Sequence, residues 1–343
     1  MIYLNLLIVI LLIVAIHEYG HYLAARLFGA TVTDFSIGFG KPIYQYTDKN
    51  NTKWKISPIP LGGYVKIKGL DTVFQKNINI EEGSFQYLKL YQKIVVLLAG
   101  SLFNIISAWI VIFLFLFLSG IPNFTAKIAE VLENTPAYNS GLQPKDIIIS
   151  MNNKKINFFN DVIKIVQTDK KIEINFLRDN KLLTTNLETI FNKELNRNTI
   201  GIKVSTDNVQ FIKYDFYNSF KQSVLSISSF YYLNFSHLKK SYNENSLSND
   251  LAGPIGIVKN ARKFNLDTLN GSINIFIAFS LIISLFNLFP IPLLDGGHIL
   301  YFTISRIFSN SLPEFVTRIY LAIGITIISF IFIFVTFNDI FYK

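Results

Sequence analysis

The sequence MIYLNLLIVILLIVAIHEYGHYLAARL (residues 1–27) decides the class of this chain, because it places two histidines and a glutamate inside an apolar run. The run has the roughly 20 residues that a helix needs to cross the hydrocarbon of a bilayer. Ionisable side chains at that depth are costly, and they persist where they pair, bind an ion or line a wet cavity. No basic segment precedes the run and no small-residue cleavage site follows it, so we expect a retained membrane helix that carries a polar site.

The composition of the chain favours membrane insertion. Of its 343 residues, 50% are hydrophobic and only 16% are charged, and several apolar runs reach spanning length. The net charge of +9 comes from lysines scattered among Asn and Asp, which indicates solvated loops and attraction to anionic lipid rather than to nucleic acid. The chain has no cysteine, which excludes disulfides and thiolate metal sites, so a metal has to be held by His, Asp or Glu.

Apolar segments divide the chain into a two-part membrane core. The pattern predicts a polytopic α-helical membrane protein with four transmembrane helices, at about residues 4–28, 94–118, 272–293 and 319–337. Over about 31–70, aromatic and β-branched residues alternate with Gly and Pro, which predicts a membrane-associated β-hairpin region. We therefore expect the two halves of the core at 1–120 and 251–343.

The polar middle of the chain predicts one extramembrane domain and a linker. Residues 121–207 contain strand-like pieces and short helical stretches near 136–141 and 158–167, which is typical of a small α+β domain or a partly open β-barrel. Within the linker, 208–250, the uncharged stretch 222–238 has the length of a fifth span. However, large apolar residues recur at three- and four-residue intervals with Ser, Asn and Lys between them, which favours an amphipathic helix at a membrane interface. They are Tyr217, Phe220, Val224, Ile227 and Tyr231.

The stretch HEYGH carries the chemistry of the first helix. His17 and His21 are spaced i, i+4, so both imidazoles lie on one helix face and can bind one Zn²⁺. Glu18 adjoins them and can act as general base on a metal-bound water. A chance match on a solvated surface is the alternative, and the cost of burying ionisable groups in a membrane argues against it.

A catalytic zinc site needs a third protein ligand, and three residues are candidates. Asp295 and His298 lie in NLFPIPLLDGGHIL (287–300), where two Pro and two Gly break an apolar helix. Broken backbone at membrane depth is tolerated around a protein-lined or wet cavity. We therefore expect Asp295 as the third ligand with His298 as its neighbour, while His237 lies in the amphipathic segment as a surface histidine.

A shared metal constrains the topology, because both motifs must reach the same membrane depth. Each motif lies toward the C-terminal end of its helix, so the first and third spans must run in the same direction. One span therefore separates them, which excludes 222–238 as a crossing.

The paired motifs HEYGH and NLFPIPLLDGGH resemble the site-2 protease family of intramembrane zinc metalloproteases, peptidase family M50. The bacterial branch typified by the regulator of sigma E protease is the most similar. The resemblance extends along nearly the whole chain. The stretch from SIGFGKPIYQY to SPIPLGGYVKIKG resembles the family's membrane-reentrant β-loop, and SFQYLKLYQKIVVLLAGSLFN resembles the start of its second helix. LAGPIGIV (251–258) resembles its Gly-Pro segment, and VLENTPAYNSGLQPKDIIISMNNKKI resembles a single PDZ domain. Ser101 stands where the family usually has Pro, whereas Asn104 is retained.

The resemblance implies roles for individual residues. It makes His17, His21 and Asp295 the zinc ligands and Glu18 the base. Asn287 matches a position that engages the substrate backbone or transition state, with a capping or interhelical hydrogen bond as the alternative. Gly62 and Gly63 lie in the β-loop, where substrate contact is implied, although hairpin geometry is the simpler reason for two glycines.

The function implied by the resemblance is zinc metalloendopeptidase activity inside the membrane. Substrates would be single-pass membrane proteins, such as an anti-sigma factor or a remnant signal peptide, cut in regulated intramembrane proteolysis. The family places the active site toward the cytoplasmic side of the bacterial inner membrane and the PDZ domain outside, where it would bind a peptide C-terminus. The alternatives are a PDZ-bearing membrane scaffold with a non-catalytic zinc site and, disfavoured by the few spans, a metal transporter.

Overall fold

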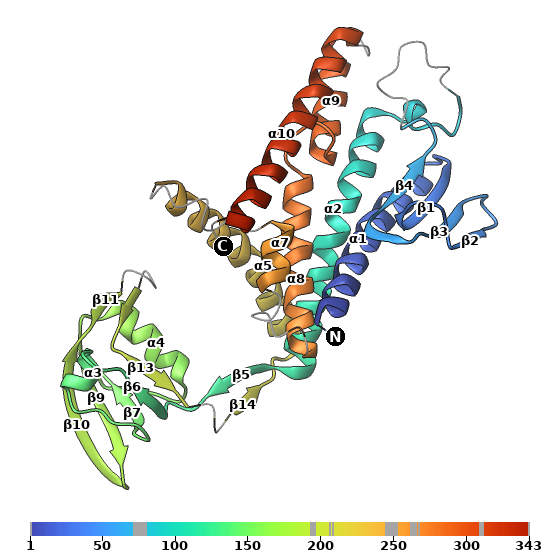
Figure 1. Cartoon of the computed structure of the whole chain (residues 1–343). Coiled ribbons are helices and arrows are strands. Elements are labelled where there is room, and N and C mark those ends of the chain that lie inside the picture. Colours follow the sequence, from blue (N-terminus) through green and yellow to red (C-terminus); the bar gives the residue numbers. More distant parts are fainter. Residues whose placement is uncertain are drawn as a thin grey trace. The chain divides into compact units, whose positions relative to one another are not determined.

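The structure is a computed structural model whose described part divides into two compact units, shown in Figure 1: residues 1–113 with 221–343, and residues 114–220. The structure describes residues 2–70, 81–192, 197–205, 207, 209–243, 253–260, 266, 268–308 and 312–341. Each unit is considered by itself. The first holds the membrane helices and is called the membrane unit; the second is called the β-rich unit.

Four described helices are long and apolar enough to cross a membrane, as the sequence predicts. They are α1 (Ile2–Leu27), α2 (Leu90–Leu114), α8 (Leu269–Asn287) and α10 (Glu314–Phe341). A π-helical turn, Phe115–Ser119, extends α2. The prediction of four spanning helices is confirmed by length and composition, although α2 and α10 begin earlier than expected.

The predicted end of the third span was wrong, because α8 stops at Asn287 rather than near residue 293. Pro290 and Pro292 follow, and proline has no N–H to continue a helix and forces the preceding residue out of the helical region. A new helix, α9 (Asp295–Ile307), begins after this break. Its Gly297 lets the broken segment fold back closely, since a Cβ there would lie 2.0 Å from the Ile291 carbonyl oxygen. Asp295 is therefore the first residue of a helix.

The spanning helices pack through small residues. In Figure 1, α1 and α8 lie side by side and run in the same direction, while α2 runs opposite to both. Gly20 brings α1 against α2 so closely that an added Cβ would lie 2.5 Å from the Ala99 carbonyl oxygen. Small residues of this kind let helix backbones approach in a membrane, where no hydrophobic force drives association. The close approach sets the distance between α1, which carries the two histidines, and α2, which packs against them.

A four-stranded sheet follows α1 in the chain. Its strands are β1 (Val32–Phe39), β2 (Tyr44–Thr47), β3 (Lys53–Ile56) and β4 (Ile59–Ile67), in the order β2-β3-β1-β4. β2 and β3 form a hairpin, but β1 pairs with β3 in parallel and with β4 antiparallel, so the region is a mixed sheet and not a set of hairpins. β4 is an edge strand and packs along α1.

Aromatic side chains attach this sheet to α1. Tyr22 of α1 makes edge contacts with Phe35 and Trp54, with ring centroids 6.1 and 5.1 Å apart. Phe85, between the sheet and α2, is fully buried in the same apolar cluster. Because aromatic residues bury large areas, this cluster fixes the sheet beside the C-terminal half of α1.

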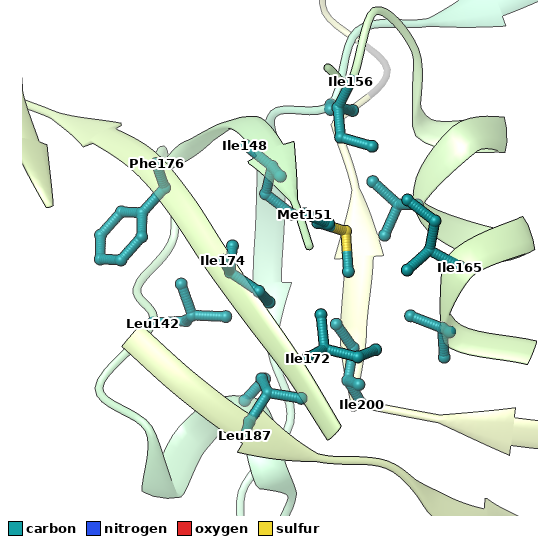
Figure 2. Close-up of a cluster of buried hydrophobic side chains, with 14 of the residues drawn as sticks. Leu142, Ile148, Met151, Ile156, Ile165, Ile172, Ile174, Phe176, Leu187 and Ile200 are labelled. Atoms are coloured by element: carbon teal, nitrogen blue, oxygen red, sulfur yellow. The ribbon is translucent and has the colours of Figure 1, made fainter. Parts of the chain in front are cut away.

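The β-rich unit is an α+β fold around its own apolar core. A four-stranded sheet has the order β10-β9-β7-β8, and the helix α4 (Phe159–Thr168) lies against it. Figure 2 shows Ile148, Met151 and Ile174 of this sheet meeting Ile165 of α4. The strands of this sheet are β7 (Ile147–Met151), β8 (Lys154–Lys155), β9 (Lys171–Arg178) and β10 (Lys181–Glu188). The other elements are β5 (Ile121–Phe124), β6 (Ile128–Val131), α3 (Pro136–Asn139), β11 (Ile190–Asn192), β12 (Arg197–Thr199), β13 (Ile202–Val204) and β14 (Val209–Ile212).

Within the linker lies one long helix, α5 (Phe216–Asn243). It is not among the described helices that are apolar enough to span a membrane. It exposes Tyr217, Phe220 and Val224, three of the residues whose spacing predicted an amphipathic helix. Of the Gly-Pro segment, Leu251 and Ala252 lie outside the described residues, Gly253 precedes α7 (Pro254–Asn260), and the residues from Pro254 to Val258 belong to that helix. The interfacial location of α5 stays a prediction.

Candidate metal centre

Three of the predicted residues meet at one point of the membrane unit. His17 and His21 lie one turn apart on α1, and Asp295 reaches them from the first turn of α9. The Asp295 Oδ2 atom lies 3.3 Å from His17 Nε2 and 3.4 Å from His21 Nε2, while the two Nε2 atoms are 3.2 Å apart. Both histidines are buried, and the three form a group able to hold a metal ion.

The spacing of these three atoms fits a tetrahedral zinc site. With metal–ligand bonds of about 2.0–2.1 Å, any two ligand atoms of a tetrahedron lie about 3.3 Å apart. The three observed separations are 3.2, 3.3 and 3.4 Å, so the atoms form one face of such a tetrahedron. Two imidazoles, one carboxylate and a fourth position left open are the donor set of catalytic rather than structural zinc sites.

One of the histidines is held by the second helix. His21 Nδ1 lies 2.8 Å from the Val96 carbonyl oxygen of α2. A carbonyl can only accept, so Nδ1 carries the proton and Nε2 is left with a free lone pair directed at the cluster. Partners of this kind fix the tautomer and the orientation of metal-binding histidines.

A glycine of α2 makes room for both imidazoles. A Cβ at Gly100 would lie 2.3 Å from His21 Nε2 and 2.7 Å from His17 Cε1. Every other residue type would therefore displace a ring or separate the helices. Gly100 keeps α2 against the cluster without filling it.

The cluster opens into a cavity of about 330 Å³. Polar groups enter it from three elements: the histidines and Glu18 from α1, Asn287 from α8, and Asp295 from α9. Most of the remaining wall is aliphatic: Val14, Val65, Ile67, Leu70, Val96, Leu97, Ile283, Leu293 and Leu294. A few convergent polar groups in an apolar wall are typical of a site that binds and orients an apolar substrate.

Glu18 lies between the cluster and the sheet. Glu18 lines the cavity together with Gly63 and Val65 of β4. An added Cβ at Gly63 would lie 2.7 Å from the Ser36 carbonyl oxygen and 3.7 Å from Glu18 Cγ. Gly63 therefore permits the close approach of the sheet edge to Glu18.

Gly62 and Asn287 also line the cavity. Gly62 has φ of +140°, a conformation that favours glycine, and an added Cβ would lie 2.8 Å from a ring carbon of Phe39. Asn287 Nδ2 lies 3.4 Å from His17 Nε2, so its amide faces the cluster across the two parallel helices. The local backbone conformation explains why residue 62 is a glycine, whereas Asn287 lies beside a candidate metal ligand.

The other two histidines lie outside the metal-binding group. His298 Nδ1 lies 3.0 Å from the Leu294 carbonyl oxygen, and His237 Nδ1 lies 3.3 Å from Ser241 Oγ on α5. Among the described residues, the group consists of His17, His21 and Asp295. Val96 and Gly100 were not among the predicted site residues. A backbone carbonyl gives no sequence signal, and Gly100 appears in the sequence only as the glycine before Ser101.

Four apolar helices with a His–His–Asp cluster, and a glutamate beside it, define a multi-span membrane protein with a metal-dependent hydrolytic type of site. The model of peptidase family M50 matches residues 5–331, and the chain belongs to this family. It is 30% identical to a Brucella suis protein named "Putative zinc metalloprotease", over 98% of this chain and 94% of that protein. A Campylobacter jejuni protein of the same description is 31% identical, over 98% and 93%.

Solved structures give a more local similarity. The PDZ domain of the SdrC-like protein from Listeria monocytogenes is 18% identical, covers 25% of this chain and 94% of its own, and has a TM-score of 0.22. The second domain of a Listeria protein, solved in solution, is also 18% identical, with coverages of 25% and 89% and a TM-score of 0.22.

Proposed function

We propose that this chain is an intramembrane zinc metalloendopeptidase, with His17, His21 and Asp295 as zinc ligands and Glu18 as general base. The observation that carries the proposal is the triangle of ligand atoms with sides of 3.2, 3.3 and 3.4 Å, formed by two histidines of α1 and one aspartate of α9. Membership of peptidase family M50 supports the peptide bond as the target.

Bound zinc would supply a Lewis acid for the scissile carbonyl and would lower the pKa of the attacking water. The protein groups have separate tasks around it. Glu18 takes the proton of the attacking water and delivers it to the leaving amine. Asn287, whose amide nitrogen lies 3.4 Å from His17 Nε2, can donate to a carbonyl oxygen of the substrate backbone or of the transition state.

The depth of the site indicates the substrate class. His17 follows 15 helical residues of α1, so the cluster lies where a membrane-spanning peptide would present its bonds. We infer that the substrates are single-pass membrane proteins cut in or near their transmembrane segments, for example an anti-sigma factor or a remnant signal peptide. A spanning helix has its amides bonded internally, so it must unwind before Glu18 and the metal can act on it.

The edge strand β4 can receive the unwound segment. Four residues of β4 line the cavity: Gly62, Gly63, Val65 and Ile67. An extended peptide that adds to a sheet edge gains main-chain hydrogen bonds in place of those lost on unwinding. We propose this pairing as the way in which the substrate is held across the cluster.

The setting of the enzyme is also proposed. The site would face the cytoplasmic side of the bacterial inner membrane, as the family resemblance implies. The β-rich unit, in this proposal a PDZ-like domain on the extracytoplasmic side, would bind a peptide C-terminus. The α+β content of that unit is compatible with this assignment.

The direct test is reconstitution of the full chain in lipid with zinc and a labelled single-pass peptide. Glu18→Gln should lower the cleavage rate by about 100-fold or more, because general base catalysis contributes that much. It should leave the zinc content unchanged, because Glu18 is not a ligand. Undiminished cleavage by Glu18→Gln would refute the mechanism, and bound zinc without cleavage of any membrane peptide would favour the scaffold alternative.

A further inference from the structure

The two histidines of the cluster differ in how their second ring nitrogen is held. His21 Nδ1 donates to the Val96 carbonyl oxygen at 2.8 Å. His17 Nδ1 is buried and has no hydrogen-bond partner among the residues that the structure describes. If Nε2 binds the metal, Nδ1 carries a proton and is a donor in need of an acceptor. Metal-binding histidines almost always have such an acceptor in a carboxylate, a carbonyl or a water.

An unused acceptor of the right kind lies on the facing helix. Asn104 of α2 is fully buried, and within the described part of the chain neither its amide oxygen nor its amide nitrogen has a hydrogen-bond partner. A buried amide without partners carries an uncompensated desolvation cost, so its presence in a native helix calls for an explanation. The donor on His17 and the acceptor on Asn104 are complementary.

The packing of α1 on α2 places Asn104 on the correct side of His17. The helices are antiparallel: His21 bonds to Val96, and His17 Cε1 lies against Gly100. Asn104 is one turn further along α2, about 6 Å beyond Gly100 and rotated from it by about 40°. This is the side of His17 that faces away from His21, where Nδ1 is not used by the cluster.

Ser101 is a natural comparison for Asn104. It is also fully buried on α2, and its hydroxyl has no partner in the described chain. However, it is rotated by about 100° from Gly100, the residue that contacts His17. Burial of an unpaired polar group is therefore common to both residues, but only Asn104 lies within about 40° of the face of α2 that Gly100 presents to His17.

We propose that Asn104 is a positioning residue for His17: its amide oxygen accepts the His17 Nδ1–H hydrogen bond through one bridging water. The water is needed because no direct bond joins the two side chains, and buried waters typically serve such otherwise unpaired groups. One metal-binding histidine is then oriented by a backbone carbonyl and the other by a side chain. The inference rests on the proposed function, because it assigns His17 Nε2 to zinc.

The test measures zinc affinity of the full-length protein in lipid nanodiscs, after chelator treatment, by competition with a chromophoric chelator. Asn104→Leu keeps the branched shape and the number of side-chain heavy atoms but removes the acceptor, and it should weaken zinc binding by about 10- to 100-fold. Asn104→Asp keeps an acceptor of the same length and should retain the wild-type affinity or exceed it. Ser101→Ala is the matched control and should bind zinc as the wild type does.

Two further readouts separate positioning from a structural role. The metal-free Asn104→Leu protein should be at least as heat-stable as the metal-free wild type, because an unpaired amide has been replaced by an apolar group. With Co²⁺ in place of zinc, Asn104→Leu should change the visible absorption spectrum, whereas Ser101→Ala should not.

The outcomes distinguish this inference from the function on which it rests. Wild-type protein that binds no zinc would refute the proposed function. Wild-type protein that binds zinc, with equal affinity in Asn104→Leu, would overturn only the inference. Equal weakening by Asn104→Leu and Ser101→Ala would also overturn it, because a general effect of α2 packing would then be responsible.

Discussion

The membrane unit and the β-rich unit treat buried polar groups in opposite ways. In the β-rich unit the buried carboxylate of Asp146 is paired with Arg178, which approaches to 2.8 Å and also donates to the Gly141 carbonyl oxygen. That contact raises the pKa of Arg178. In the membrane unit, His17 Nδ1 and the Asn104 amide are buried with no partner in the described chain.

This difference indicates that the β-rich unit is stabilised by its own residues, whereas the membrane unit carries the reactive site. In the β-rich unit, the buried polar pair and the continuous apolar core need no ligand to complete them. Polar groups without partners are costly in a membrane and persist where an ion, a water or a substrate completes them. We therefore expect the properties of the membrane unit to depend on metal, and those of the β-rich unit to be independent of it.

The largest expected effect is the loss of metal from Asp295→Asn. The amide oxygen is a neutral, weak ligand, so this change removes one of the three protein ligands and should weaken zinc binding by more than about 100-fold, beyond the effect of losing a partner that only orients a ligand. Metal content after dialysis measures this, with Glu18→Gln as the control that should retain zinc. If the zinc content of Asp295→Asn equals that of the wild type, Asp295 is not a ligand. The contrast between the two units would then fail.

The next effect belongs to the β-rich unit. Ile174 lies on β9, which pairs with β10 and β7, and its side chain is fully buried. Ile174→Ala should therefore destabilise this unit by about 2–5 kcal/mol. Hydrogen exchange of peptides from residues 171–178 in the full chain should accelerate, while zinc affinity should stay at the wild-type value. A simultaneous fall in zinc affinity would show that the two units are coupled.

The contrast between the units also explains what the sequence can predict. The spacing of His17 and His21 on one helix fixes their common face, and the break around Asp295 marks a cavity, so the cluster follows from local rules. The apolar segments likewise predict the four spans. These features depend on the identities of residues close together in the sequence.

Other features depend on which backbone meets which, and local sequence does not record that. The Val96 carbonyl that holds His21 is a group that every residue has. The parallel pairing of β1 with β3 depends on the whole sheet, and a hairpin prediction based on alternation cannot contain it. The end of α8 was missed because an apolar run continues past Asn287, although Pro290 and Pro292 already forbid a helix there.

The smallest expected effect concerns the turn between β2 and β3, where the membrane unit satisfies its polar groups outside the spanning helices. Asp48 accepts hydrogen bonds from Trp54 Nε1 at 2.9 Å and from the backbone amides of Asn50 and Thr52. The bond from Trp54, more than any other cause, holds the pKa of Asp48 below its ordinary value.

A carboxylate whose pKa is lowered by folding stabilises the turn above its unfolded pKa, and this contribution is lost as the pH falls through the lower folded value. Trp54 fluorescence should therefore change with a midpoint below the ordinary pKa of aspartate, and Asp48→Asn should abolish the transition. A midpoint at or above the ordinary aspartate value would show that the turn does not hold the charged form. The pairing of Asp48 would then not set this turn apart from the unpaired polar groups of the metal site.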